Sequence, residues 1–268
     1  MSHINKISFI GFGHLARALV QGALEAKVFT KEQLIVTSPS LIQGRKSCQF
    51  HIALTNQEAA AQADIIVLAV KPQQISMVCR EISKVIRENQ LVISVAAGQS
   101  ISQIEAYLNH KTSSIVRAMP NTAAEVSAGV TALFYHPNVT REARAFVHQL
   151  FQSTGLVVDV TKEDEIDLIT ALSGSGPAYF FYLQEALMLA GIKRGLSKEV
   201  AQSLVKQTMY GASLLTRDLD VTFEEKRAQV TSPSGTTAAA ISHLEDNNFL
   251  QLIDSMIEKA YLRAQALK

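Results

Sequence analysis

The sequence has no tryptophan, only two cysteines and almost no net charge. Cys48 and Cys79 form no paired metal-binding or redox spacing, so we expect two ordinary thiols in a reducing cytosol. A net charge of +1 gives no electrostatic reason to bind nucleic acid or an anionic membrane. We predict no metal site, because the histidines with no obvious role lack ligand spacing: His51, His110, His136, His148 and His243.

Long apolar runs are also missing. None approaches the roughly 18 residues that span a bilayer, and the N-terminus lacks the basic and apolar segments of a signal peptide. We therefore expect a soluble, cytoplasmic protein with no membrane partner. Apolar residues make up 47% and charged residues 18% of the 268 positions, enough for one large domain or two ordinary ones.

From Lys6 to about Asp159, short β-branched runs alternate with longer helical patterns such as Leu15–Ala26 and Gln73–Ile86. Several of the runs are apolar on both faces, which is typical of parallel strands covered by helices on each side. This alternation predicts an α/β fold with a doubly wound sheet. The expected strands are Ile7–Ile10, Leu34–Thr37, Ile65–Val70, Leu91–Val95 and Ser114–Ala118.

After about Lys162 the strand-like runs stop and Ala- and Leu-rich helical patterns follow. We predict a Rossmann-type domain over residues 1–161 and an all-α domain over 162–268. The stretch from Leu168 to Ile192 is apolar nearly all round, which favours burial against a second subunit. A monomeric helix cluster that covers itself is the alternative. The expected helices are Asp164–Leu189, Lys198–Arg217, Thr236–Leu244 and Phe249–Leu267.

The segment Gly11–Ala16 reads Gly-x-Gly-x-x-Ala between the first strand and the first helix, a tolerated form of the dinucleotide-binding fingerprint. The first glycine permits a tight turn, Gly13 lets a pyrophosphate approach the backbone, and Ala16 keeps the helix close to the sheet. The helix N-terminus then offers free N–H groups to the phosphates.

The end of the second strand reads Thr37-Ser38-Pro39-Ser40 and has no acid to hold ribose hydroxyls. Arg45 and Lys46 follow, and hydroxyls with nearby cations suit a 2′-phosphate. We therefore expect NADPH as cofactor, with NADH as the alternative. A plain helix cap suits Thr37–Ser40 equally well.

Two further motifs lie in the helical half. Leu172–Tyr179 places Gly and Pro inside a helical pattern, where they are costly, so it marks either a kink or a close approach of a backbone or ligand. Val230–Thr237 precedes a helix and reads either as an ordinary cap or as a cradle for a carboxylate.

Together with the fingerprint, these motifs resemble the pyrroline-5-carboxylate reductase family. The likeness runs along the whole chain, and Ser-Gly-Ser-Gly-Pro-Ala-Tyr with Thr-Ser-Pro-x-Gly-Thr-Thr is its most specific part. It also includes Ala69–Gln73, Val95–Gly98 and Met119–Thr122. The family reduces 1-pyrroline-5-carboxylate to L-proline, the last step of proline biosynthesis, with hydride from NAD(P)H. Its members are homodimers interlocked through the helical domain, often assembled into pentamers of dimers.

The resemblance implies roles for individual residues. Ser232, Gly235 and Thr236 match the loop that holds the substrate carboxylate, and Thr237 matches the threonine beside the ring nitrogen. Two positions depart from the family: Ser234 stands where Gly is usual, and His14-Leu15 replaces the commoner Asn-Met or Gln-Leu. The positions that match cofactor contacts are Ile10, Gly11, Phe12, Gly13, His14, Leu15, Ser38, Asn56, Ala69, Val70, Lys71, Pro72, Ala96, Ala97 and Gly98.

Reducing a cyclic imine needs little acid–base equipment, because a protonated imine accepts hydride readily. Thr237 is expected to hydrogen-bond the nitrogen and to relay its proton. Three other functions stay open: a hydroxyacid dehydrogenase, which the lack of lysine between Ile166 and Ile192 disfavours; a reductase of another cyclic imine carboxylate; and a non-catalytic NADPH-binding regulator.

Overall fold

The computed structural model describes residues 6–44, 50–217 and 222–267. Its chain divides into two compact units. The first holds the residues up to Ser175 together with the C-terminal residues from Ala260, and the second is Gly176–Lys259. The predicted boundary near residue 162 remains a proposal.

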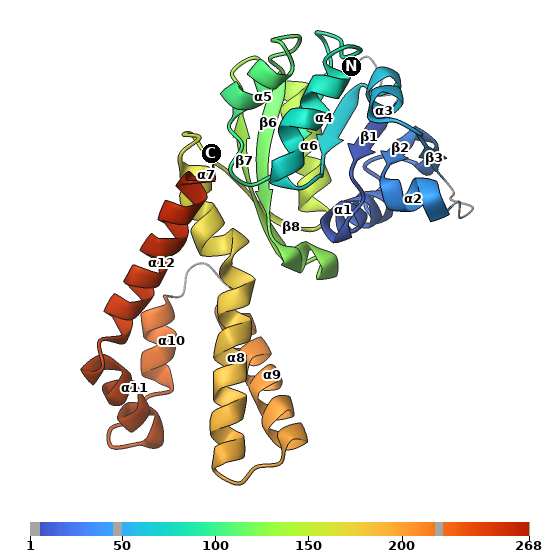
Figure 1. The fold of residues 1–268 in the computed structure, drawn as a ribbon. Coiled ribbons are helices and arrows are strands. Elements are labelled where there is room, and N and C mark those ends of the chain that lie inside the picture. Colours follow the sequence, from blue (N-terminus) through green and yellow to red (C-terminus); the bar gives the residue numbers. More distant parts are fainter. Residues whose placement is uncertain (1–5, 45–49, 218–221, 268) are drawn as a thin grey trace. The chain divides into compact units, whose positions relative to one another are not determined.

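The first unit contains an eight-stranded sheet in the order β3-β2-β1-β4-β5-β6-β7-β8 (Figure 1). The strands up to β6 are parallel, β7 runs antiparallel to β6, and β8 runs parallel to β7. The predicted α/β class and doubly wound sheet are confirmed. The strand bounds are β1 Ile7–Ile10, β2 Leu34–Thr37, β3 His51–Ile52, β4 Ile65–Leu68, β5 Leu91–Ser94, β6 Ile115–Pro120, β7 Gly129–Tyr135 and β8 Gly155–Asp159.

Helices cover both faces of this sheet and create two separate apolar clusters. On one face α1 (His14–Glu25) and α6 (Arg141–Gln152) pack against side chains such as Phe9. On the other, α3 (Asn56–Gln62), α4 (Ile75–Ile82) and α5 (Ile101–Tyr107) pack against Ile10 and its neighbours. The strands β1, β2, β4 and β5 are buried on both sides, so their sequences are largely apolar without alternation.

Short elements complete the first unit. They are η1 (Lys31–Gln33), α2 (Pro39–Gly44), η2 (Pro72–Gln74), η3 (Thr122–Val126), α7 (Glu165–Ile169) and a π-helical turn, η4 (Thr170–Gly174). The predicted helix over Asp164–Leu189 is therefore interrupted at the small-residue motif. The interruption separates α7 from α8 (Gly176–Lys193).

The second unit is entirely helical in the part that the structure describes. It contains α8, α9 (Lys198–Leu215), α10 (Phe223–Gln229), α11 (Thr236–Asp246) and the first part of α12 (Phe249–Gln265). Large apolar side chains on α8 lie in the open: Phe180, Phe181 and Tyr182 are 57%, 66% and 74% exposed. A single copy of this unit thus buries very little of its own apolar surface.

Candidate active site

The glycine-rich turn joins β1 to α1 at the carboxyl end of the sheet. Gly11 has φ +94°, its N–H donates to the carbonyl of Thr37 at 2.9 Å, and a Cβ there would lie 2.5 Å from the carbonyl oxygen of Ala69. Only glycine satisfies both the conformation and this close approach. Gly13, at the N-cap of α1, faces open space, with nothing within 4 Å of a Cβ. A phosphate can therefore reach the backbone there.

Three more expected cofactor segments gather at the same edge. Ala69–Pro72 follows β4, and the N–H of Ala69 donates to the carbonyl of Ile10 at 2.8 Å. Ala96–Gly98 follows β5, the next parallel strand. The carboxyl ends of parallel strands meet at one edge, which is where open α/β sheets bind their ligands. The structure thus places Gly11–Leu15, Ala69–Pro72 and Ala96–Gly98 side by side in sheet order.

A cavity of about 460 Å³ adjoins this edge beyond the end of β2. Ser38 is buried, and its hydroxyl lies 3.0 Å from the hydroxyl of Ser40. Asn56, at the start of α3, lines the cavity, and its amide nitrogen donates to the Glu81 carboxylate at 2.7 Å. Arg45 and Lys46, expected beside a 2′-phosphate, lie outside the described residues. The lining consists of Thr37, Pro39, Ile42, Leu54, Thr55, Asn56, Gln57 and Glu81.

His14 occupies the first position of α1, and its side chain is 91% exposed. Its Nδ1 lies 3.4 Å from a carboxylate oxygen of Glu125 on η3. The imidazole is thus exposed at the helix end where the fingerprint predicts a phosphate.

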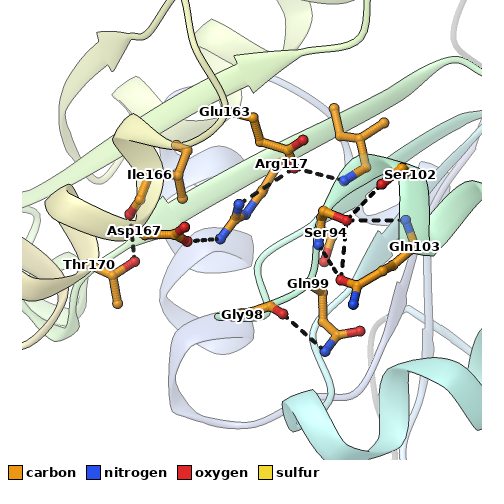
Figure 2. Close-up of polar contacts among 12 residues, drawn as sticks. Ser94, Gly98, Gln99, Ser102, Gln103, Arg117, Glu163, Ile166, Asp167 and Thr170 are labelled. Atoms are coloured by element: carbon orange, nitrogen blue, oxygen red, sulfur yellow. Dashed lines mark hydrogen bonds and ion pairs between the residues drawn. The ribbon is translucent and has the colours of Figure 1, made fainter. Parts of the chain in front are cut away.

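Behind the loop after β5 lies a buried group of charges that the sequence analysis missed (Figure 2). The guanidinium of Arg117 on β6 donates to Asp167 at 2.8 Å and lies 3.5 Å from Glu163. Arg117 and Asp167 are each only 1% exposed. Glu163 also accepts the N–H of Ile101 at 2.7 Å, at the first turn of α5. These bonds fix the point at which α5 begins, three residues after Gly98.

The small-residue motif makes a π-helical turn in which the N–H of Ser175 donates to the carbonyl of Thr170 at 2.9 Å. A Cβ on Gly174 would lie 2.5 Å from Cε of Met119. Asn121 donates to the carbonyl of Ser173 at 3.3 Å. The motif is therefore both a break in the helix and a place of close approach, and the group that approaches is the end of β6.

In the second unit, Thr231–Gly235 links α10 to α11. Gly235 is the N-cap of α11, and its N–H is already used, since it donates to the carbonyl of Ser232 at 3.0 Å. The N–H groups of Thr236 and Thr237 have no partner among the described residues, so the turn presents open donors. The hydroxyl-bearing side chains of Ser232 and Thr236 are exposed, and that of Thr237 is half-buried. The four expected substrate residues thus lie in one turn.

Ser234 in this turn has φ +60°, a left-handed conformation that favours glycine. A glycine at this position would adopt the same conformation without strain. The serine keeps the same turn at the expense of some strain.

In the described ranges, no group of three or more His, Cys, Asp or Glu side chains could hold a metal ion. No helix in those same ranges is long and apolar enough to cross a membrane.

Two family models match the chain. That for pyrroline-5-carboxylate reductase dimerisation matches residues 163–267, and that for the coenzyme F420-dependent NADP oxidoreductases matches residues 6–98. The pyrroline-5-carboxylate reductase of Pseudomonas aeruginosa is 38% identical over 98% of this chain and 96% of its own, and that of Haemophilus influenzae is 36% identical over 98% and 97%.

Solved structures agree with these sequence matches. A pyrroline-5-carboxylate reductase from Coxiella burnetii is 39% identical, with a TM-score of 0.90 over 99% of each chain. The pyrroline carboxylate reductase of Plasmodium falciparum, solved with NADP bound, is 32% identical, with a TM-score of 0.86 over 98% of this chain and 97% of its own.

Proposed function

The chain belongs to the pyrroline-5-carboxylate reductase family, and from that premise we propose which of its residues carry out the reaction. The protein reduces 1-pyrroline-5-carboxylate to L-proline with NAD(P)H. The similarity of nearly the whole chain to enzymes of this one activity carries the conclusion. We assign binding to two turns: the glycine-rich turn binds the dinucleotide, and Ser232–Thr237 binds the substrate.

The residues of the first unit fit a dinucleotide. Gly13 leaves the backbone open at the N-terminus of α1, where the free N–H groups and the helix dipole favour a pyrophosphate. When bound, the nicotinamide supplies the hydride that reduces the imine carbon. We propose NADPH over NADH, since no acid follows β2 and a relative binds NADP. This placement supports the cofactor contacts that the sequence predicts. We propose them for Ile10–Leu15, Ser38, Asn56, Ala69–Pro72 and Ala96–Gly98.

In the second unit the proposed task is to anchor the substrate carboxylate. The exposed hydroxyl of Ser232 and the open N–H groups of Thr236 and Thr237 suit an anion. The N–H of Gly235 is not available, because it closes the turn onto Ser232. Gly235 therefore contributes by shaping the turn.

Thr237 is the proposed catalytic residue. It stands one residue into α11, with its side chain half-buried. A threonine hydroxyl both donates and accepts hydrogen bonds, so it can hold the substrate nitrogen in position and relay to it a proton that the hydroxyl regains from water. No stronger acid is required, since the protonated imine already accepts hydride.

The helical half is the proposed site of self-association. The exposed aromatic side chains of α8 exceed what a monomer normally leaves in water, and the dimerisation family model covers this region. We propose a homodimer as the basic unit and a pentamer of dimers as its further assembly. Cytoplasmic location and the absence of nucleic-acid partners are part of the same proposal, the latter resting on the net charge of +1.

The test is steady-state oxidation of NADPH with 1-pyrroline-5-carboxylate. Thr237→Ala should lower turnover about 10–1000-fold, the loss of one positioned catalytic contact. Thr231→Ala is the matched control, because the Thr231 hydroxyl already donates to the carbonyl of Arg227 at 2.6 Å. Full turnover by Thr237→Ala would remove this residue from the mechanism.

The same assay compares substrates and cofactors. One methylene changes binding by only about 1–3 kcal/mol, so the six-membered cyclic imine must be compared directly. Faster reduction of that ring would favour it as the substrate. Binding of NADPH without turnover of either imine would favour a regulator. Replacing NADPH by NADH measures the proposed cofactor preference directly.

A further inference from the structure

Of the described residues that line the cavity beyond β2, Glu81 alone has an ionisable side chain. It comes from α4, while the rest of the lining comes from the end of β2, from α2 and from the start of α3. The residues directly after β2 include no acid. The carboxylate of Glu81 instead reaches the cavity from α4, which is distant in the sequence. Its role therefore needs its own explanation.

The carboxylate of Glu81 is bound to Asn56. The amide nitrogen of Asn56 donates to Oε2 of Glu81 at 2.7 Å, a short distance that is typical of a charged acceptor. An ionised carboxylate can only accept hydrogen bonds. The group of Asn56 that faces it must therefore be the NH₂ and not the carbonyl. Glu81 thus selects one of the two orientations of the Asn56 amide.

From this contact we infer that Glu81 is a positioning residue for the cofactor: it holds Asn56 so that the amide meets the adenosine end of the dinucleotide in one fixed orientation. The inference rests on the proposed placement of the dinucleotide at this edge of the sheet. With one N–H committed to Glu81, Asn56 presents its second N–H and its carbonyl oxygen in fixed directions. An unheld amide would lose this arrangement whenever it rotated.

A purely structural link between α3 and α4 is the competing explanation. The two helices are also joined by Gln57, whose Nε2 donates to the backbone carbonyl of Glu81 at 3.2 Å. At the opposite end of α3, Arg87 donates to the carbonyls of Ala61 and Ala63 at 2.6 and 2.9 Å. Gln57 therefore joins the two helices without the Glu81 side chain, and Arg87 holds the far end of α3 from outside α4.

The test is a double-mutant cycle with Glu81→Ala, Asn56→Ala and both together, read as KM for NADPH and kcat in the full-length enzyme. Glu81→Ala should raise KM for NADPH about 3–10-fold, the size of one lost hydrogen bond, and leave kcat within about twofold. The double variant should match Asn56→Ala, because Glu81 acts through Asn56. Glu81→Gln keeps an acceptor, so it should recover most of the affinity.

Arg87→Ala is the matched structural control, because it removes two bonds to α3 away from the cavity. It should lower Tm without changing KM for NADPH. An unchanged or lower KM in Glu81→Ala, or effects of Glu81→Ala and Asn56→Ala that simply add, would overturn the inference. An unchanged KM in Asn56→Ala would overturn it together with the proposed cofactor contact of Asn56. If Asn56→Ala alone raises KM, the contact stands and the positioning role fails.

Discussion

Removing the carboxylate of Asp167 should be among the most destabilising single changes in the first unit. Asp167 and Arg117 are each 1% exposed and 2.8 Å apart. Taking one partner from a buried ion pair leaves an uncompensated charge and costs about 3–5 kcal/mol. Glu163 stays 3.5 Å from the guanidinium and is 24% exposed, so some compensation remains. We therefore expect the lower end of the range, about 3 kcal/mol, for Asp167→Ala.

Thermal unfolding at a fixed protein concentration measures this loss. For a unit of about 150–250 residues, each kcal/mol lowers Tm by roughly 2–4 °C, so Asp167→Ala should lower Tm by about 6–12 °C. His51→Gln is the control, since His51 and Glu58 form an exposed contact at 3.4 Å that contributes about 1 kcal/mol or less. Replacing both charges, with Arg117→Met and Asp167→Leu, should restore much of the lost stability.

Unfolding of Asp167→Ala at the same temperature as His51→Gln would refute the cost assigned to the unpaired charge. A double replacement less stable than Asp167→Ala alone would also refute it, because the penalty would then not come from the unpaired charge. A rise in KM for NADPH in Asp167→Ala would show, in addition, that the start of α5 keeps the Ala96–Gly98 loop in place.

Three further changes test other features. Gly11→Ala should abolish cofactor binding and lower Tm, because φ is +94° and the Cβ would lie 2.5 Å from the Ala69 carbonyl; NADPH binding by fluorescence that matches the parent would contradict this. Burial raises the pKa of the Cys79 thiol to about 12, so Cys79 should resist alkylation at pH 8 until denaturant is added, as mass spectrometry of its peptide would show. Ser234→Gly should raise Tm or leave it unchanged, because φ is +60°, and a clear fall in Tm would mean that the serine side chain stabilises the turn.

The elements that could be predicted from the sequence are those with strong local patterns. Five parallel strands were expected from apolar β-branched runs, and each is present to within about two residues at its ends. β3 has only two residues, too few for a pattern, and β8 contains the apolar run Leu156–Val158 but is largely exposed, unlike the buried strands that were predicted. β7 runs antiparallel after a turn through Ser127, at φ +54°, a reversal that alternation of strands and helices does not suggest.

Local sequence patterns could not predict contacts between residues that are far apart in the chain. Asn56 and Glu81 are 25 positions apart, and Arg117 and Asp167 are 50 apart. A charged residue in an apolar strand predicts that a partner exists but not which one, because the partner is chosen by the packing of whole helices. By contrast, the glycine-rich turn and the Ser232–Thr237 turn could be identified, since each is complete within a few consecutive residues.

The choice of cofactor shows how these two kinds of information combine. The end of β2 has no acid, which favours a cofactor with a 2′-phosphate. The fold then brings Glu81 to the same cavity, and a free carboxylate there would repel that phosphate. The amide of Asn56 binds this carboxylate at 2.7 Å, but a neutral hydrogen-bond donor does not remove its negative charge. The proposed preference for NADPH over NADH therefore rests on the end of β2, and the charge of Glu81 opposes it.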